Sequence, residues 1–129
     1  MSRAKQRLAY STVLILCERF PSVFAAEGKI EPRPLRIGIY EELVVAAPDL
    51  DPKALQLAML SYTGAMRYQR CMIAGRPRIG LDGQMVDDIV TQDQADHAVF
   101  RIARAHQRWD AQREAKRAKL ARQQPEARP

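Results

Sequence analysis

A capping motif at residues 91–94 predicts that the last third of the chain is one long helix, and this feature constrains the fold more than any other. In Thr91-Gln92-Asp93-Gln94, a threonine and a glutamine three residues later can each satisfy a free backbone N–H of the other. Apolar residues then recur at helical spacing as far as Trp109, so the first half of this helix should pack on the body. From Asp110 onward charges surround the axis, which predicts a solvated helix that frays into a disordered end over residues 123–129.

The chain before this helix begins with a second helical pattern. Apolar residues over 7–20 predict a helix that Pro21 ends, because proline cannot continue the hydrogen-bond ladder. A loop over 27–34 follows, then a short extended piece over 35–39 with alternating apolar residues, and a short helix over 40–47. The sequence therefore predicts mainly helices joined by irregular segments.

Two short motifs give sharper boundaries. Asp51 followed by Pro52 places a capping carboxylate before a proline at the first helical position, so a helix should start there and run toward Gly64. Asp82-Gly83 lies between strand-like segments and predicts a tight two-residue hairpin turn with both residues at positive φ. We expect a mostly helical α+β protein with a short β-hairpin, a folded domain over 1–109 and a basic helical extension over 110–129.

The composition fits one domain of ordinary size. The chain has 129 residues, 47% of them apolar, which is enough to bury a core. No apolar run is long enough to span a membrane and no secretory signal starts the chain, so we expect a cytoplasmic protein without membrane contact. Cys17 and Cys71 cannot form a four-ligand zinc site, and reduced, packed thiols are favoured over a disulfide.

The positive charge is concentrated at one end of the chain. Nine of the 21 basic and three of the 15 acidic side chains lie in residues 101–129, which leaves twelve of each sign in residues 1–100. A second basic region has no carboxylate between Asp51 and Asp82 but five cations: Lys53, Arg67, Arg70, Arg76 and Arg78. A basic surface on a neutral body suits a polyanionic partner, although the same charges could simply be solvated.

The residues that catalysis would need are absent as a group. His97 and His106 are nine residues apart, about 900° of helical rotation, which places them on opposite faces of one helix. No nucleophile, zinc-protease, phosphate-loop or dinucleotide motif occurs. We therefore expect no catalytic residue, cofactor, metal or small-molecule substrate.

A cluster of arginines and tyrosines points instead to nucleic acid. Six of these side chains fall within seventeen residues: Tyr62, Arg67, Tyr68, Arg70, Arg76 and Arg78. Arginines neutralise phosphates, and an aromatic ring that stacks on a base contributes ~1–3 kcal/mol. The alternative is that Tyr62 is a core residue on the apolar face of its helix and that Tyr68 is a packing residue after it.

Four motifs in register resemble the ProQ/FinO domain of bacterial RNA chaperones over about residues 8–105. They are Arg19-Phe20-Pro21-x-x-Phe24, Arg33-Pro34-Leu35-Arg36-Ile37-Gly38-Ile39, Tyr62-Thr63 with Arg67-Tyr68, and Gly75-x-x-Arg78-x-x-Leu81-Asp82-Gly83. The resemblance implies a compact domain that binds small regulatory RNAs and messenger 3′ regions. It also implies recognition of a terminator-like hairpin with a single-stranded, U-rich 3′ tail, by a minimal member without a second folded domain.

The resemblance also indicates which residues are expected to bind RNA. They are the motif residues together with a nearby arginine: Arg36, Gly38, Tyr62, Thr63, Arg67, Tyr68, Arg76 and Arg78. The helix after Gly38 looks like the one whose N-terminus receives the RNA 3′ end, where free N–H groups attract a phosphate. Glu41 and Glu42 would repel that phosphate unless they point away from it.

The chain departs from the family pattern at several positions. Pro52 and Gln56 stand where basic residues are common, with Lys53 nearby, Gly80 stands where an aspartate is common, and Gln69 where an apolar residue is common. These changes bear on RNA preference rather than on the class of protein.

The sequence thus predicts a monomeric, non-catalytic RNA chaperone in post-transcriptional regulation by small RNAs. A concave basic face of Arg36, Arg67, Tyr68 and Arg78 would hold the duplex backbone and the 3′ tail. Two alternatives stay open: an adaptor whose basic C-terminal helix docks on an acidic protein, and a DNA-binding regulator.

Overall fold

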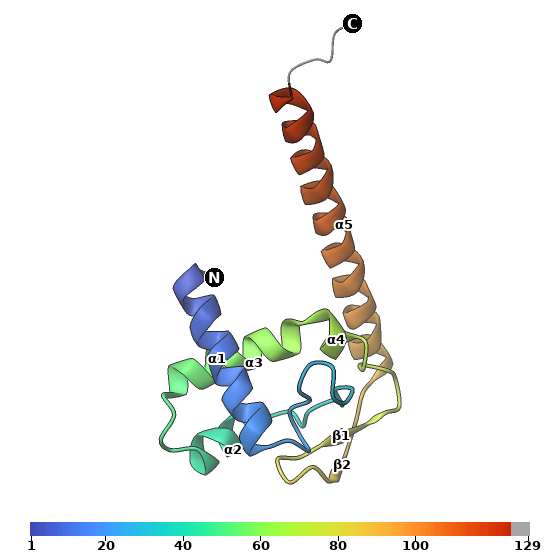
Figure 1. Cartoon of the computed structure of the whole chain (residues 1–129). Helices are drawn as coiled ribbons and strands as arrows, with labels where there is room; N and C mark the ends of the chain where they lie inside the picture. Colours follow the sequence, from blue (N-terminus) through green and yellow to red (C-terminus); the bar gives the residue numbers. More distant parts are fainter. Residues whose placement is uncertain (125–129) are drawn as a thin grey trace, which may run out of the picture.

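A computed structural model describes residues 1–124 as a small helical body from which one long helix projects (Figure 1). The body contains α1 (Arg3–Arg19), α2 (Ile39–Ala46), α3 (Pro52–Gly64), α4 (Met66–Gln69) and the strands β1 (Pro77–Ile79) and β2 (Met85–Ile89). The projecting helix is α5 (Gln92–Gln123). This is the mostly helical α+β architecture that the sequence predicts.

The ends of α1 and α3 follow from local capping. The hydroxyl of Ser2 accepts a hydrogen bond from the N–H of Lys5, so α1 begins four residues before the predicted start, and it ends just before Pro21. The Asp51 carboxylate accepts from the N–H of Lys53 and Pro52 occupies the first helical turn, as predicted.

The core forms where α1 crosses α3 and the loop after α1 folds beneath them (Figure 1). Its centre is aromatic, because the Phe24 ring lies 5.1 Å from that of Tyr62 and the Tyr62 ring 5.6 Å from that of Tyr68. Tyr62 and Tyr68 are therefore core residues, the alternative that the sequence had left open for them. The other buried members include Leu16, Leu43, Leu55 and Ile79.

The extended piece predicted over 35–39 is wrong for all but its first residue. Leu35 forms a single parallel bridge to Ile79, in which Ile79 donates to the Pro34 carbonyl and Arg36 donates to the Ile79 carbonyl. Gly38 then adopts a φ of +92°, which turns the chain out of the strand direction and directly precedes α2. The glycine within the alternating pattern is what ends the strand.

The hairpin turn differs from the prediction in length and in conformation. Five residues separate β1 from β2, and Gly83 has a φ of +80° whereas Asp82 does not have a positive φ. The Asp82 carboxylate accepts from the N–H of Gln84, and Gly83 donates to the Gly80 carbonyl. Because the aspartate stabilises the turn through its side chain, only the glycine needs the left-handed conformation.

The helix α5 has the predicted capping box. Gln94 N–H donates to the Thr91 hydroxyl at 3.2 Å, and Thr91 N–H donates to the Gln94 side-chain oxygen at 2.9 Å. Ala95 and Ala98 are buried against the body, and beyond residue 105 the helix is exposed up to Gln123. Most of the predicted disordered end, residues 125–129, lies outside the described residues.

The predicted boundary between residues 109 and 110 falls within the uninterrupted α5 and stays a prediction. Cys17 and Cys71 are free thiols, as expected. Across residues 1–124, no helix has the length and apolar character that crossing a membrane requires.

Candidate nucleic-acid interface

Two of the predicted site residues hold the backbone of Leu35. The Leu35 N–H donates to the Tyr68 hydroxyl at 3.0 Å, and the Arg78 guanidinium donates to the Leu35 carbonyl at 2.9 Å. Leu35 is directly followed by Arg36 and, two residues later, by Gly38. Tyr68 and Arg78 therefore fix the position at which Arg36 and the start of α2 reach the surface.

Arg78 is a buried connector between three parts of the fold. Its side chain is only 6% exposed, and besides Leu35 its guanidinium donates to the Gln94 side-chain oxygen at 2.8 Å. Its Nε lies 3.4 Å from an Asp88 carboxylate oxygen, an ionic contact that is too poorly aligned to count as a hydrogen bond. Gln94 and Asp88 were not predicted as site residues, although the capping box at Thr91 had already marked Gln94 as a structured side chain.

The two core tyrosines act through their hydroxyls. Tyr62 accepts a hydrogen bond from the Ala25 N–H at 2.9 Å, and burial raises the pKa of Tyr62 to about 12. Burial also raises the pKa of Tyr68, whose ring is 5% exposed. Both phenols stay protonated near neutral pH, and both rings pack within the core, so their faces are not open to a base.

Arg36 and Gly38 lie at the exposed edge of this arrangement, at the N-terminus of α2. Gly38 caps the helix without a side-chain hydrogen bond, and Arg36 forms an ion pair with Glu42 across the first turns. A Glu41 carboxylate oxygen lies 3.7 Å from the position that a Cβ on Gly38 would take. Neither carboxylate points away from this helix end, and that of Glu42 is balanced by Arg36.

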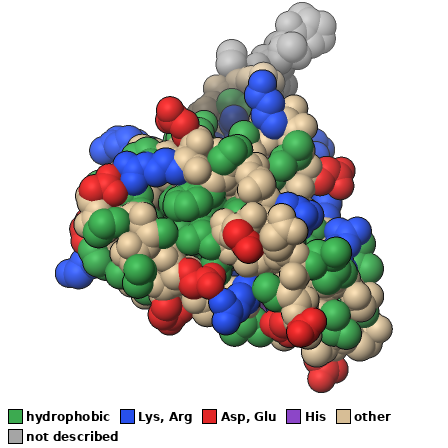
Figure 2. Space-filling view, turned by 90° about the horizontal axis from the view of Figure 1, so that it is seen from below, with side chains coloured by type: hydrophobic (Ala, Val, Ile, Leu, Met, Phe, Trp, Pro, Cys, Tyr) green, Lys and Arg blue, Asp and Glu red, His purple; other side chains and the backbone are tan. Residues whose placement is uncertain are grey.

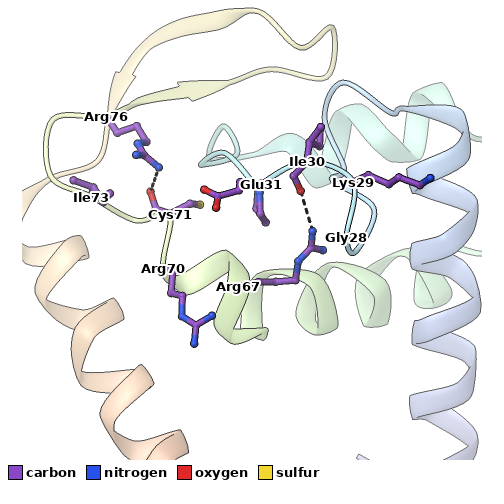
Figure 3. Close-up of a pocket in the computed structure, with 10 residues that line it drawn as sticks. Gly28, Lys29, Ile30, Glu31, Arg67, Arg70, Cys71, Ile73 and Arg76 are labelled. Carbon is purple, nitrogen blue, oxygen red and sulfur yellow. Dashed lines mark hydrogen bonds between the residues drawn. The ribbon is translucent and has the colours of Figure 1, made fainter.

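Arg67 and Arg76 line a separate pocket together with residues 28–32 of the loop before Leu35 (Figure 3). Arg67 donates to the carbonyls of Ala25, Ala26 and Ile30, at 2.7, 3.2 and 3.2 Å, and so fastens this loop to α4. The pocket encloses about 370 Å³. Two further cations at its rim, Lys29 and Arg70, were not among the predicted site residues, and the Glu31 carboxylate lies between them and Arg76.

Thr63 lies apart from both groups. Its hydroxyl donates to the Met59 carbonyl at 2.7 Å within α3, and its side chain lines a depression against α5 together with Tyr68. The predicted residues are thus brought together in two places, around Leu35 and in the Arg67 pocket, rather than in one.

The lower face of the body carries charges of both signs. Figure 2 shows acidic and basic side chains interspersed around an apolar centre on this face. Across residues 1–124, no three His, Cys, Asp or Glu side chains are grouped so that they could hold a metal ion. The geometry offers hydrogen-bond donors and isolated cations for a phosphate backbone.

Comparison with known proteins decides the family. A model of the ProQ/FINO family matches residues 8–118, which is most of the chain. The chain belongs to the ProQ/FINO family. An RNA chaperone ProQ of Shewanella piezotolerans is 35% identical over 109 residues, covering 82% of this chain and 50% of that protein. The RNA chaperone ProQ of Haemophilus ducreyi is 35% identical over 112 residues, covering 84% and 57%.

Solved ProQ/FinO structures show the same fold. The solution structure of a ProQ homolog from Legionella pneumophila matches with a TM-score of 0.60 and 27% identity, over 82% of this chain and 86% of that one. The crystal structure of a FinO-like RNA chaperone from Neisseria meningitidis matches with a TM-score of 0.58 and 17% identity, over 72% and 92%. The chain spans about half the length of the curated ProQ relatives that it matches.

Proposed function

We propose that this ProQ/FINO protein is a non-catalytic RNA chaperone that recognises a terminator-like hairpin together with its single-stranded, U-rich 3′ tail. The observation that carries the proposal is the double hold on Leu35, by Tyr68 and by Arg78, which sets Arg36 beside the N-terminus of α2. A guanidinium next to a helix N-terminus is a suitable site for a terminal phosphate or a 3′ end. The relatives named RNA chaperone ProQ support the same function.

The predicted residues take different roles in this proposal. Arg36 and Gly38 contact the RNA, since they are exposed. Tyr62, Tyr68 and Arg78 are positioning residues, because they are buried and hold backbone groups of the surrounding loops. Arg67 and Arg76 add a second cationic contact for RNA at their pocket. Thr63 lines the depression against α5.

Selectivity in this proposal comes from shape and from the free end. The major groove of A-form RNA is too narrow for side chains to read, so duplex RNA is recognised through its backbone and its 2′-hydroxyls. The partners would be structured small RNAs and messenger 3′ ends in the cytoplasm. The protein would act as a monomer, which light scattering of the free chain would test.

A binding titration tests the proposal. Fluorescence anisotropy would compare a terminator hairpin that has its 3′ U-tail with the same hairpin lacking it. We expect removal of the tail to weaken binding at least tenfold, because the site at α2 loses its ligand. Equal affinities would show that the tail is not recognised, and no binding of either RNA would remove the proposed function.

The exposed, basic α5 supports one alternative function, a protein-binding adaptor. Beyond residue 105 this helix is exposed, projects away from the body and carries a net positive charge (Figure 1). An adaptor could use it to hold an acidic protein. A pull-down treated with ribonuclease separates the two functions, because an adaptor keeps its partner after the RNA is destroyed. A duplex DNA competitor in the titration tests the DNA-binding alternative.

A further inference from the structure

A groove lies between α5 and the turn that joins α3 to α4, outside the two residue groups described above. It encloses about 440 Å³, with Arg101, Arg104 and Arg108 on its α5 side and residues 64–66 opposite. A terminal nitrogen of Arg101 lies 3.9 Å from the position that a Cβ on Gly64 would take. The arginine therefore reaches across the groove, and the small Gly64 leaves room for it.

The charged side chains that line the groove are all basic. Four nitrogen-bearing side chains form one stripe along α5, because they follow one another at spacings of four, three and four residues. They are His97, Arg101, Arg104 and Arg108. No carboxylate lines this groove, and none of the three arginines forms an ion pair within residues 1–124. The stripe is ~17 Å long at 1.5 Å per residue, which matches a run of about three to five phosphates.

Exposed aromatic rings lie among these cations. Phe100 and Trp109 line the groove and are 57% and 48% exposed. The Arg104 guanidinium lies 5.8 Å from the centre of the Phe100 ring, and the Trp109 ring meets that of His106 edge-on. Guanidinium groups beside open aromatic faces bind unpaired nucleotides of any sequence, because every base has a face that can stack.

The groove also leads to the site around Leu35. A second depression of about 370 Å³ shares Gln69, His97 and Arg101 with it and is lined by Thr63 and Tyr68. Tyr68 is the residue that holds Leu35 beside Arg36. A flexible strand can therefore follow a continuous surface from Trp109 to the neighbourhood of the first site, on which Asp93 in the second depression is the one carboxylate among the lining residues.

We propose that this groove binds an unpaired RNA segment, with its phosphates on Arg101, Arg104 and Arg108 and a base stacked on Trp109. The proposal rests on the RNA-binding function proposed above and adds a second, single-strand subsite to it. Base-paired RNA is disfavoured there, because the bases inside a duplex are already stacked on both neighbours.

Trp109 makes the test direct, because it is the only tryptophan of the chain. The full chain is titrated with a ten-nucleotide oligouridylate while tryptophan fluorescence is recorded, and with the same RNA carrying a fluorophore for anisotropy. We expect the RNA to quench Trp109. Trp109→Ala should weaken binding of the labelled RNA at least fivefold, with partial recovery in Trp109→Phe.

A charge-matched pair of variants separates the groove from general attraction. Arg104→Ala with Arg108→Ala removes two groove cations, and Arg117→Ala with Arg122→Ala removes two cations farther along the same helix. The first pair should weaken oligouridylate binding at least tenfold and lower its salt slope by about 1.4, at ~0.7 per phosphate contact. The second pair should change the affinity less than threefold.

Four outcomes would overturn the proposal. Equal effects of the two double variants would mean that α5 attracts RNA without a groove site. A tailed hairpin that binds while no RNA alters Trp109 fluorescence would remove the subsite and leave the proposed function intact. Quenching by an oligoglutamate peptide as strong as that by RNA would assign the groove to an acidic protein segment. If neither the tailed hairpin nor the oligouridylate binds in the anisotropy assay, both the groove proposal and the proposed RNA-binding function are wrong.

Discussion

The guanidinium of Arg36 and the carboxylate of Glu42 form an ion pair 2.5 Å long at the start of α2. One Glu42 oxygen accepts from Arg36, and the other is buried without a hydrogen-bond partner among the described residues. The arginine proposed to meet RNA is thus held by a carboxylate beside the helix end that should receive a phosphate. In the proposed function, RNA and Glu42 would compete for the same cation.

Glu42→Gln should therefore strengthen RNA binding. The substitution removes the charge that competes for Arg36 and leaves an amide that still fits the site. We expect the affinity for a tailed hairpin to rise about three- to tenfold at low salt, measured by anisotropy. Glu41→Gln is the matched comparison, since it removes a charge that also lies near this helix end but does not pair with Arg36, so its gain should be smaller. Equal gains in both variants would show that net charge alone matters.

Arg78→Ala should weaken both the fold and RNA binding. The substitution leaves the Leu35 carbonyl and the Gln94 side-chain oxygen without their shared donor, at a cost of about 2–4 kcal/mol in the free energy of unfolding. Binding of a tailed hairpin, measured where the variant is still folded, should fall several-fold or more because Arg36 loses its support. Urea unfolding checks the first effect.

Tyr68→Phe provides a second way to loosen the same segment. It removes the acceptor of the Leu35 N–H but keeps the buried ring and every cation. If Arg78 and Tyr68 act by positioning, the phenylalanine variant should also lose RNA affinity, though less than Arg78→Ala. Unchanged RNA affinity in Tyr68→Phe would contradict that role.

Local signals in the sequence were sufficient for most helix boundaries. The starts at Asp51 and Thr91 and the stop before Pro21 each depend on two to four neighbouring residues, and the structure confirms all three. The extended piece over 35–39 was wrong because one glycine at positive φ outweighs an alternating pattern. Capping chemistry is local, whereas a single bridge to Ile79 is not.

The arrangement of the site could be predicted less well. Arg78 looks in the sequence like a surface cation, but its acceptors come from Leu35, 43 residues earlier, and Gln94, 16 residues later. Arg67 in the same way fastens carbonyls about 40 residues away. An arginine in a sequence shows which groups it could bind, while its burial depends on contacts that only the folded chain brings together.

Arg122→Ala should have almost no effect on specific binding. Arg122 lies in the last turn of α5, far from both residue groups. Its loss should lower the salt slope of hairpin binding by at most about 0.7 to 0.9 and leave the discrimination between tailed and untailed hairpins unchanged. A loss of that discrimination would mean that the tail contacts the end of α5.

The thiol of Cys71 should react far more slowly than that of an unfolded chain. Burial raises the pKa of Cys71 to about 11, so little thiolate forms at pH 8, and the residue is only 5% exposed where it borders the Arg67 pocket. A disulfide reagent added to Cys17→Ser, which leaves Cys71 as the single thiol, should label it only as the protein opens. Fast labelling in the absence of urea would contradict this packing.

Alkaline pH should destabilise the protein through Tyr62. Burial raises the pKa of Tyr62 to about 12 in the folded state, above an unfolded value near 10, so the folded state keeps its proton longer. The stability from this group is complete below pH ~10 and is lost as the pH rises toward 12, by about 2–3 kcal/mol in total.

Tyr62→Phe isolates that contribution. The variant should be less stable at pH 8 by about 1–3 kcal/mol, because the buried Ala25 N–H loses its acceptor, but it should lose less stability between pH 9 and 11 than the unaltered protein. Urea unfolding of the variant and of the unaltered protein at pH 8, 9 and 11 measures both changes in stability. Tyr10→Phe is the control, since it removes the hydroxyl of a tyrosine that is 61% exposed. A steep alkaline loss that persists in Tyr62→Phe would assign the titration to the other buried groups, Tyr68 and Cys71, whose pKa values burial also raises.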